Sequence, residues 1–269
     1  MEFGICTHSV IPVRAEPSHK AEMTSEILFG ELYRMVEKAD PWIRIQLAFD
    51  NYEGWISASQ AALIGEPEFI RLSRAETPMT TDLVQIITNE SRDLMIPVVM
   101  GTSLPGISGE RLQIAGEDYQ YEGSLTESAS QEDADSRKMT LQTRKNIVDT
   151  ALLYLNAPYR WGGRSPFGID CSGLVQMAFK LNNIRLLRDA GQQATQGEVV
   201  SLPGESEPAD LVFFDDEEGK IVHVGILADR HHVIHCSGMV RLDPIDHEGI
   251  YNAALQRYTH KLRLIKRLI

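Results

Sequence analysis

The stretch that decides the fold reads YRWGGRSPFGIDCSG and runs from Tyr159 to Gly173. It is a glycine-rich loop that leads directly into a predicted amphipathic helix over residues 171–182, with Cys171 in the first turn. The N–H groups and the positive dipole end of a helix stabilise a thiolate, so this position predicts a lowered cysteine pKa. A thiolate attacks acyl carbons, which makes Cys171 a candidate nucleophile. A lone cysteine is more often a small buried apolar residue, and position alone favours that interpretation.

Two histidines downstream shift the balance toward nucleophilic chemistry. His223 lies in the apolar run Ile221–Leu227 and His235 in a second run, with a polar turn at Asp229–His232 between them. We expect the runs to pair as a hairpin centred on residue 229, so that His223 lies opposite His235, although a slip by two residues stays open. One imidazole would accept the thiol proton and the second would orient the first. A single mid-strand histidine is more often a core residue, but this pair, with a cysteine at a helix start, indicates a triad.

Zinc binding is the competing chemistry. Four residues are potential ligands: Cys171, His223, His235 and Cys236. Residues 235 and 236 are neighbours on a predicted strand and point to opposite faces. These four residues form neither the familiar Cys-x-x-Cys nor the familiar His-x-x-x-His spacing. The sequence therefore disfavours zinc, and we expect no metal and no organic cofactor.

The segments around this stretch indicate the architecture. Residues 140–155 have apolar side chains at helical spacing, and strand-like runs follow at 211–214, 221–227, 233–235 and 262–268. The C-terminal half is thus helices followed by antiparallel strands, an α+β layout. Residues 1–64 contain short β segments between Pro and Gly breakers, typical of a small barrel or sandwich. Residues 67–122 look similar, with strand-like runs at 68–72, 83–88, 94–100 and 112–115.

The balance of acidic and basic residues changes near residue 136. The 269 residues carry 26 basic and 38 acidic side chains, a net charge of −12, with a pI of about 5.1. This balance argues against a nucleic-acid binder that follows phosphates. Residues 1–136 contain 9 basic and 23 acidic side chains, whereas residues 137–269 contain 17 and 15. We expect β modules at 1–64 and 65–123, a Ser- and Glu-rich linker at 124–137, and a further domain at 138–269.

The cysteine content and the N-terminal sequence indicate the cellular compartment of the protein. Three cysteines, Cys6, Cys171 and Cys236, are too few for a disulfide framework. No apolar run has the length of a membrane-spanning helix, and the first residues show neither a basic nor an apolar leader region. We therefore expect a cytoplasmic protein that binds no membrane, although a trimmed leader would leave the same sequence. The other histidines, His260 among them, have no comparable context and are expected at the surface. The sequence does not indicate an oligomeric state.

The C-terminal half, residues 138–269, resembles the NlpC/P60 family of papain-like cysteine peptidases. The resemblance is carried by Tyr159–Gly173, by the strand sequence His-Val-Gly-Ile that starts at His223, and by His235. The N-terminal half resembles bacterial SH3 (SH3b) modules in three places: Glu22, the string LFGE at 28–31 and the string NYEGW at 51–55. Together the halves are similar to γ-D-glutamyl-L-diamino-acid endopeptidases, also called dipeptidyl-peptidase VI. This implies a papain-like α+β catalytic domain preceded by two small SH3b-like β-barrel modules.

The resemblance also implies roles for single residues. Cys171 matches the nucleophile, His223 the general base and His235 the third polar residue, while Tyr159 matches a tyrosine that helps hold the oxyanion. Five positions match residues that bind the peptide: Asp170, Ser172, Asp189, Glu22 and Tyr52. In relatives a serine often follows the aspartate of the Arg-Asp pair; here it is Ala190, which puts one hydrogen bond to the substrate in doubt. Carboxylates among these residues would suit a free amino terminus.

The activity that this resemblance predicts is hydrolysis of the bond between γ-D-glutamate and a diamino acid, diaminopimelate or lysine. The partner would be a murein tri- or tetrapeptide with a free N-terminal L-Ala, in cell-wall peptide recycling. Two alternatives stay open: a secreted hydrolase of intact peptidoglycan, with the SH3b half as a targeting module, and a non-catalytic peptide- or wall-binding protein. Acyl transferases use the same thiolate and histidine chemistry, and an amine acceptor competing with water would reveal one.

Overall fold

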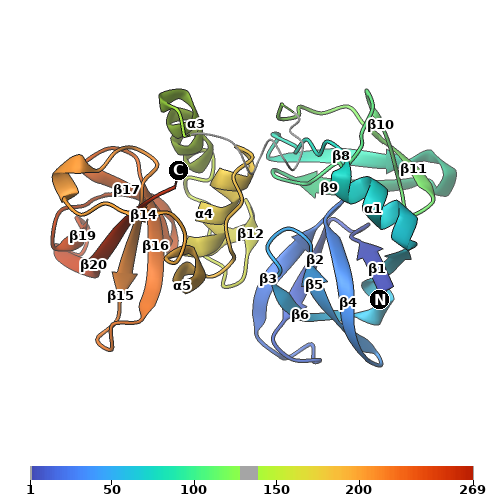
Figure 1. The fold of residues 1–269 in the computed structure, drawn as a ribbon, viewed down its shortest axis with the longest axis horizontal. Coiled ribbons are helices and arrows are strands. Elements are labelled where there is room, and N and C mark those ends of the chain that lie inside the picture. The colour runs from blue at the N-terminus through green and yellow to red at the C-terminus, as the bar shows by residue number, and fades with distance from the viewer. Residues whose placement is uncertain (1, 128–138, 269) are drawn as a thin grey trace. The chain divides into compact units, whose positions relative to one another are not determined.

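The computed structural model describes residues 2–127 and 139–268. The chain divides into two compact units, Met1–Ser136 and Arg137–Ile269, and each is described by itself (Figure 1). The expected linker at 124–137 lies mostly outside the described residues. At its start, the backbone N–H of Thr126 donates to the carbonyl of Met79 over 2.8 Å. Within the described residues, no helix has the length and apolarity needed to cross a bilayer.

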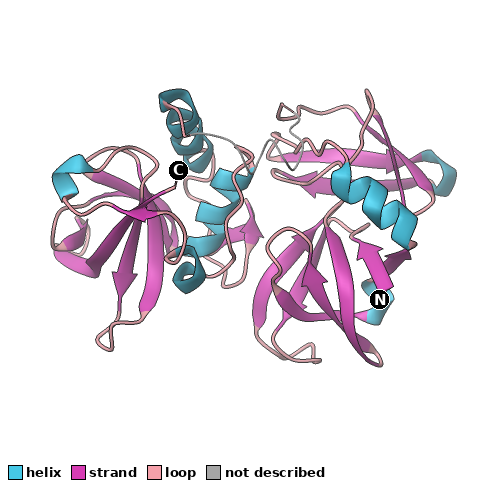
Figure 2. Ribbon diagram, in the orientation of Figure 1, coloured by secondary structure: helices cyan, strands magenta, loops and turns pink. Residues whose placement is uncertain are grey.

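The first part of the N-terminal unit is a seven-stranded antiparallel sheet with the order β3-β2-β6-β5-β4-β1-β7. Buried residues of β2 to β6, such as Ile11, Ile27, Tyr33, Ile45 and Ile56, meet in one cluster. The cluster draws on five consecutive strands of the sheet order, from β3 to β4, and the sheet curls around it (Figure 2). The bounds are β1 (Glu2–Ile5), β2 (Val10–Arg14), β3 (Met23–Leu28), β4 (Leu32–Ala39), β5 (Trp42–Leu47), β6 (Glu53–Ser57), the 3-10 helix η1 (Ala58–Gln60) and β7 (Ala62–Ile64).

The second part of this unit is a four-stranded antiparallel sheet with the order β10-β11-β8-β9. Its core includes Ile87, Val98 and Leu112, and also Ile5 and Phe29 from the first part. The two β regions therefore share a core. The prediction of a second SH3b-like module at 65–123 stays a prediction. The bounds are β8 (Val84–Asn89), the 3-10 helix η2 (Glu90–Arg92), β9 (Leu94–Val99), β10 (Arg111–Ile114) and β11 (Glu117–Tyr121).

One segment between these sheets differs from the expectation. Residues 68–72 lie within the helix α1 (Glu66–Arg74) and not in a strand. Pro67 occupies the first turn, where its missing N–H costs nothing. Acidic residues in the first turn and basic residues in the last complement the helix dipole. Phe69 and Leu72, three positions apart, are the buried pair of this helix, a spacing that a strand would place on opposite faces.

The C-terminal unit is an α+β domain, as the sequence predicts. Its main sheet has the order β14-β20-β15-β16-β17-β18, with β19 paired to β20, and the helices α3, α4 and α5 gather on one side of these strands (Figure 2). The helices are α3 (Leu141–Leu152), α4 (Cys171–Lys180), α5 (Ala190–Gln193) and the 3-10 helix η3 (Pro203–Glu205). The strands are β12 (Arg164–Ser165), β13 (Gly168–Ile169), β14 (Glu198–Val199), β15 (Leu211–Asp215), β16 (Ile221–Leu227), β17 (His232–Ser237), β18 (Met239–Pro244), β19 (Gly249–Asn252) and β20 (Arg257–Arg267).

Helix α4 is the centre of this domain. All ten of its residues are buried, and it packs against α3, β16 and β17. Burial on every side is typical of a central helix. Its first residue, Cys171, is therefore held rigidly against the sheet.

The β16–β17 hairpin forms, but its register differs from the expected one by two residues. His235 pairs with Gly225, and Leu227 pairs with Val233. A backbone hydrogen bond closes the turn between the strands: the N–H of Ala228 donates to the carbonyl of His232. Gly225 provides the space: a Cβ there would lie 2.5 Å from Val233 Cγ2, which real structures do not tolerate. The expectation that His223 lies directly opposite His235 is therefore wrong.

Candidate active site

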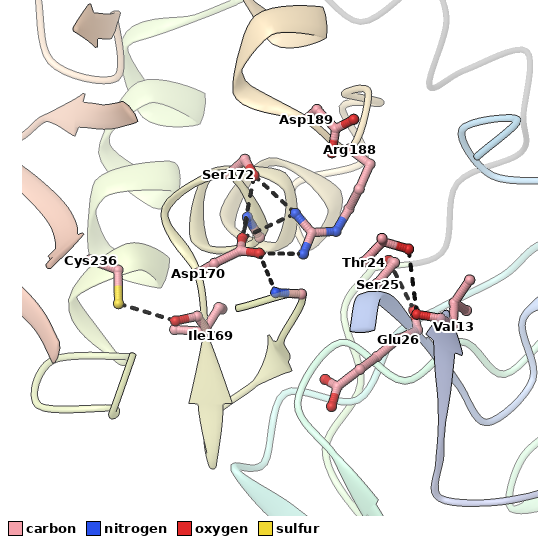
Figure 3. Close-up of polar contacts among 12 residues, drawn as sticks. Val13, Thr24, Ser25, Glu26, Ile169, Asp170, Ser172, Arg188, Asp189 and Cys236 are labelled. Atoms are coloured by element: carbon pink, nitrogen blue, oxygen red, sulfur yellow. Dashed lines mark hydrogen bonds and ion pairs between the residues drawn. The ribbon is translucent and has the colours of Figure 1, made fainter. Parts of the chain in front are cut away.

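The loop before α4 folds back onto the start of the helix. Asp170 is the N-cap residue, and its Oδ1 accepts a 2.6 Å hydrogen bond from the N–H of Gly173. Its Oδ2 accepts from the N–H of Gly162 over 2.8 Å (Figure 3). A Cβ at residue 173 would lie 2.3 Å from the carbonyl oxygen of Gly163, so glycine is required where loop and helix meet. This arrangement places Cys171 at the helix start, as the sequence predicts.

A buried guanidinium completes the surroundings of this carboxylate. Arg188 donates to both oxygens of Asp170, over 3.0 and 2.6 Å, and also to Ser172 Oγ over 2.9 Å (Figure 3). All three side chains are buried. Bidentate pairing of this kind is the strong form of an ion pair. These contacts assign Asp170 and Ser172 to the support of the helix start, and their predicted role toward the substrate stays a prediction.

The thiol of Cys171 is buried against the first strand of the hairpin. Burial raises its pKa to about 12, and the charge of Asp170 acts in the same direction. Hydrogen bonds with the backbone of Val224 and Ser172 act in the opposite direction but are outweighed. The expectation of a lowered thiol pKa is therefore not met, because desolvation exceeds the effect of the helix end. The contact with Val224 places the sulfur beside the residue that follows His223.

A hydrogen-bonded relay leads away from His223. Its Nε2 lies 2.9 Å from Nδ1 of His235, and Nε2 of His235 lies 3.1 Å from Oδ2 of Asp243. Arg241 holds the same carboxylate, with Nε 2.6 Å from Oδ2 and Nη2 donating to Oδ1 over 3.0 Å. The structure thus brings together the two histidines predicted from the sequence and adds Asp243.

The charge of Asp243 decides which nitrogens carry protons. Burial raises the pKa of this carboxyl group, but hydrogen bonds from His235 and Arg241 outweigh it and hold the pKa below the ordinary value. An ionised carboxylate only accepts hydrogen bonds, so Nε2 of His235 is the donor. Nδ1 of His235 then accepts from Nε2–H of His223. Nδ1 of His223 is left with its lone pair, and this is the atom that can accept the thiol proton.

A third histidine packs against the general-base candidate. The ring of His260, from β20, stacks on His223 with centroids 4.2 Å apart and planes 27° from parallel. Phe214 contacts both rings. Burial lowers the pKa of His223 well below its ordinary value and lowers that of His260 to about 4. His223 is therefore neutral, so one of its ring nitrogens keeps the lone pair that can accept a proton. His260 is half-buried and not fully at the surface as expected, because its ring packs against His223 and Phe214.

The remaining predicted residues fall into three groups. Tyr159 is 36% exposed, and burial together with the charges of Cys171 and Asp170 raises its pKa, so the phenol stays protonated near the thiol. Asp189 is exposed and precedes α5, where its N–H donates to Gln192 Oε1 over 3.1 Å. Two positions belong to the N-terminal unit: Glu22, which is exposed, and Tyr52, which packs against the core of the first sheet. Their roles toward the substrate stay predictions.

The alternative zinc site, formed by Cys171, His223, His235 and Cys236, is not assembled. Cys236 points away from the histidines, and its thiol donates to the carbonyl of Ile169 over 3.2 Å. Among the described residues, the one group of potential metal ligands is His223, His235 and His260.

Sequence reasoning missed two residues of the site, Asp243 and His260. A signal existed for Asp243: it lies two residues after Arg241 on the strand that follows the hairpin, and Arg241 pairs with His235. Alternate residues of a strand share a face, so Asp243 lies on the face of His235. No local pattern pointed to His260, which reaches the site from the last strand of the sheet.

A cysteine at the start of a buried helix, beside a histidine relay on an antiparallel sheet, defines a papain-like cysteine hydrolase. Comparison with known families agrees, since residues 156–261 match the NlpC/P60 family and residues 13–60 match the bacterial dipeptidyl-peptidase Sh3 domain. The C-terminal unit is thus an NlpC/P60 domain, and a bacterial SH3 domain precedes it.

Two curated relatives and one solved structure resemble the chain over most of its length. It is 29% identical to dipeptidyl-peptidase 6 of Lysinibacillus sphaericus over 193 residues, which cover 65% of this chain and 68% of the relative. It is 28% identical to a γ-D-glutamyl-L-lysine dipeptidyl-peptidase of Bacillus subtilis over 247 residues, which cover 87% and 74%. The crystal structure of an NlpC/P60 family protein from Bacillus cereus matches with a TM-score of 0.81 at 19% identity, over 99% of both chains. This last likeness shows the fold.

Proposed function

We propose that this peptidase hydrolyses the bond between γ-D-glutamate and the diamino acid, diaminopimelate or lysine, of murein peptides with a free N-terminal L-Ala. The observation that carries the proposal is the relay from Asp243 through His235 to His223, with the Cys171 thiol hydrogen-bonded to the backbone of the next residue, Val224. The names of the two curated relatives support the choice of bond.

The geometry suits a thioester mechanism. Nδ1 of His223 takes the proton of Cys171 as the sulfur attacks the γ-glutamyl carbonyl carbon. The imidazolium that forms donates through Nε2–H to His235, which Asp243 holds in the required tautomer. The Tyr159 hydroxyl and the backbone N–H groups at the start of α4 stabilise the oxyanion. His223 then protonates the leaving amine of the diamino acid, and water hydrolyses the thioester to regenerate the thiol.

Recognition of the free amine rests on acidic groups. Asp189 is an exposed carboxylate of the catalytic unit, and we assign Glu22 and Tyr52 of the SH3 domain to the same task. The excess of acidic side chains in residues 1–136 attracts an ammonium group. The match of residues 13–60 to a domain of bacterial dipeptidyl-peptidases supports a substrate-binding role for this unit. We assign the activity to recycling of released peptides in the cytoplasm.

Mass spectrometry of peptide digests tests this function. The purified protein is incubated with L-Ala-γ-D-Glu-diaminopimelate, with the lysine counterpart, with the N-acetylated form of each, and with intact sacculi. We expect release of the free diamino acid from the unblocked peptides alone. Equal cleavage of the acetylated peptides would show that the enzyme does not recognise the free amine. Activity on sacculi would favour a wall hydrolase, and binding without any cleavage would favour the non-catalytic alternative.

A further inference from the structure

Three histidines meet at the site, although the relay needs only two of them. One ring nitrogen of each of His223, His235 and His260 lies within 4.8 Å of one nitrogen of each of the others. We propose that these three side chains form a binding site for Zn²⁺ or a similar divalent transition-metal ion, and that the bound ion reversibly inhibits the peptidase. The binding of the ion does not depend on the choice of peptide bond, whereas the inhibition rests on the proposed role of His223 as the base.

The distances between the histidine ring nitrogens are close to those between the ligands of a metal ion. Zinc bonds to imidazole nitrogen at about 2.0–2.1 Å, so two ligands of one tetrahedral ion lie about 3.3 Å apart. Nε2 of His223 and Nδ1 of His235 are 2.9 Å apart, and a small opening of this hydrogen bond admits the ion. The ring of His260 stacks on His223, and its Nδ1 lies 2.9 Å from Thr259 Oγ1, so the ring must rotate to supply the third nitrogen. Three imidazoles with a water molecule in the fourth position are an established zinc environment.

The surroundings of the cluster are those that orient metal-bound histidines. Nε2 of His235 donates to the carboxylate of Asp243, which fixes the ring and directs Nδ1 toward the other two histidines. His223 and His235 are buried, and His260 is half-buried beside them. Imidazole ligands suit zinc, copper and nickel ions better than calcium or magnesium.

A path for the ion also exists. His260 lines an open pocket of about 560 Å³, together with Glu248 and Tyr258. The pocket reaches the cluster at His260, on β20, and its lining also includes the cation of Lys261.

Inhibition follows from the position of the proton on the His223 ring. In the relay, Nε2 of His223 carries the proton and Nδ1 accepts from the thiol. Coordination through Nε2 takes the lone pair of that atom, so the proton of the neutral ring moves to Nδ1. The base is then blocked at the one atom that faces the nucleophile, and chelation of the metal restores it.

Competition with a chromophoric zinc chelator tests the site directly. The measurement uses the full chain carrying Cys171→Ala, so that the thiol cannot contribute. We expect one Zn²⁺ per chain with a dissociation constant in the micromolar range or below. In this background, His260→Gln should weaken binding at least tenfold, while the matched His231→Gln at an exposed position should leave it unchanged. His260→Phe keeps a ring against His223 and should weaken binding equally, which separates ligation from packing.

Three results would overturn the proposal. The first is the absence of zinc binding by the Cys171→Ala chain at chelator-competitive concentrations. The second is equal affinity in the His260 variants and in the His231 variant. The third is binding by the wild type that disappears with Cys171→Ala, because the ion would then depend on the thiol and not on the three histidines.

Discussion

His223 and His235 share a 2.9 Å hydrogen bond even though they are not cross-strand partners; the residue opposite His235 is Gly225. The contact is diagonal, and it exists because position 225 carries no side chain. A Cβ there would lie 3.1 Å from the Cβ of His235 and closer still to Val233. The small residue between the two histidines is thus part of the catalytic geometry.

Gly225→Ala should therefore separate the two imidazoles. The added methyl group forces the hairpin apart, and overpacking of this kind costs about 1–3 kcal/mol. We expect at least a tenfold loss of kcat with a folded protein, measured by steady-state hydrolysis and circular dichroism. Gly204→Ala, where a Cβ meets no atom within 4 Å, is the matched control and should keep full activity. Normal kcat in the Gly225 variant would show that the relay does not need this spacing.

Asp243→Asn should impair the relay without disrupting the fold. An amide no longer fixes the tautomer of His235, and loss of a residue that orients a functional histidine typically costs about 10- to 100-fold in activity. The drop should appear in kcat with KM nearly unchanged. Asp246→Asn changes an exposed aspartate three residues later, which accepts from Tyr258, and should have little effect on kcat. Equal behaviour of the two variants would contradict the assignment of Asp243.

Arg188→Met should destabilise the catalytic unit strongly. It leaves the buried carboxylate of Asp170 without its guanidinium partner, and breaking a buried pair on one side costs about 3–5 kcal/mol. Urea unfolding at pH 7.5 measures the change in the free energy of unfolding. Asp149→Asn breaks the exposed pair with Lys145 and should cost no more than about 1 kcal/mol. A loss of activity without a loss of stability in the Arg188 variant would favour a substrate role for this network.

Stability should fall as pH drops below the ordinary histidine pKa of 6.5. The folded-state pKa of His223 and of His260 is lowered, so the unfolded chain binds more protons in this range and acid favours unfolding. The slope is at most about 1.4 kcal/mol per pH unit for each histidine. For His260 the window runs from 6.5 to about 4, where burial acts first and the charges of His235, Asp243 and Arg241 contribute. Urea unfolding at pH 7.5, 6.5 and 5.5 tests this direction.

The variant His260→Phe should flatten this dependence while keeping the ring against His223. A pH profile of the unfolding free energy that is identical in wild type and variant would show that His260 is not buried in its neutral form. The range above pH 5 is chosen because most carboxylates do not titrate there.

Local patterns predicted the elements that carry the chemistry. The helix start at Cys171, the strands of His223 and His235, and the α+β layout all follow from periodicity and breakers, and all are present. The register of the hairpin did not follow, because a shift by two residues keeps the same faces and only the turn and Gly225 decide it. The helix at 66–74 was mistaken for a strand because its apolar positions are too few to show a period.

Features of the site that depend on distant segments could not be predicted from the sequence pattern. His260 arrives from the last strand, and the pairing of β15 with β20 that brings it beside Phe214 is set by the whole sheet. The pKa of Cys171 depends on how deeply the helix start is buried, and composition does not indicate that depth. In each case the missing information is the packing of distant segments.

The most direct test of the central claim compares three proteins on L-Ala-γ-D-Glu-L-Lys: wild type, Cys171→Ala and Cys236→Ala. Release of lysine is followed by mass spectrometry, with folding checked by circular dichroism. Cys236 is a second buried cysteine whose thiol bonds to the carbonyl of Ile169. We predict that wild type and Cys236→Ala release lysine at similar rates, and that Cys171→Ala binds the peptide but releases none. Lysine release by folded Cys171→Ala at the wild-type rate would contradict nucleophilic catalysis by Cys171.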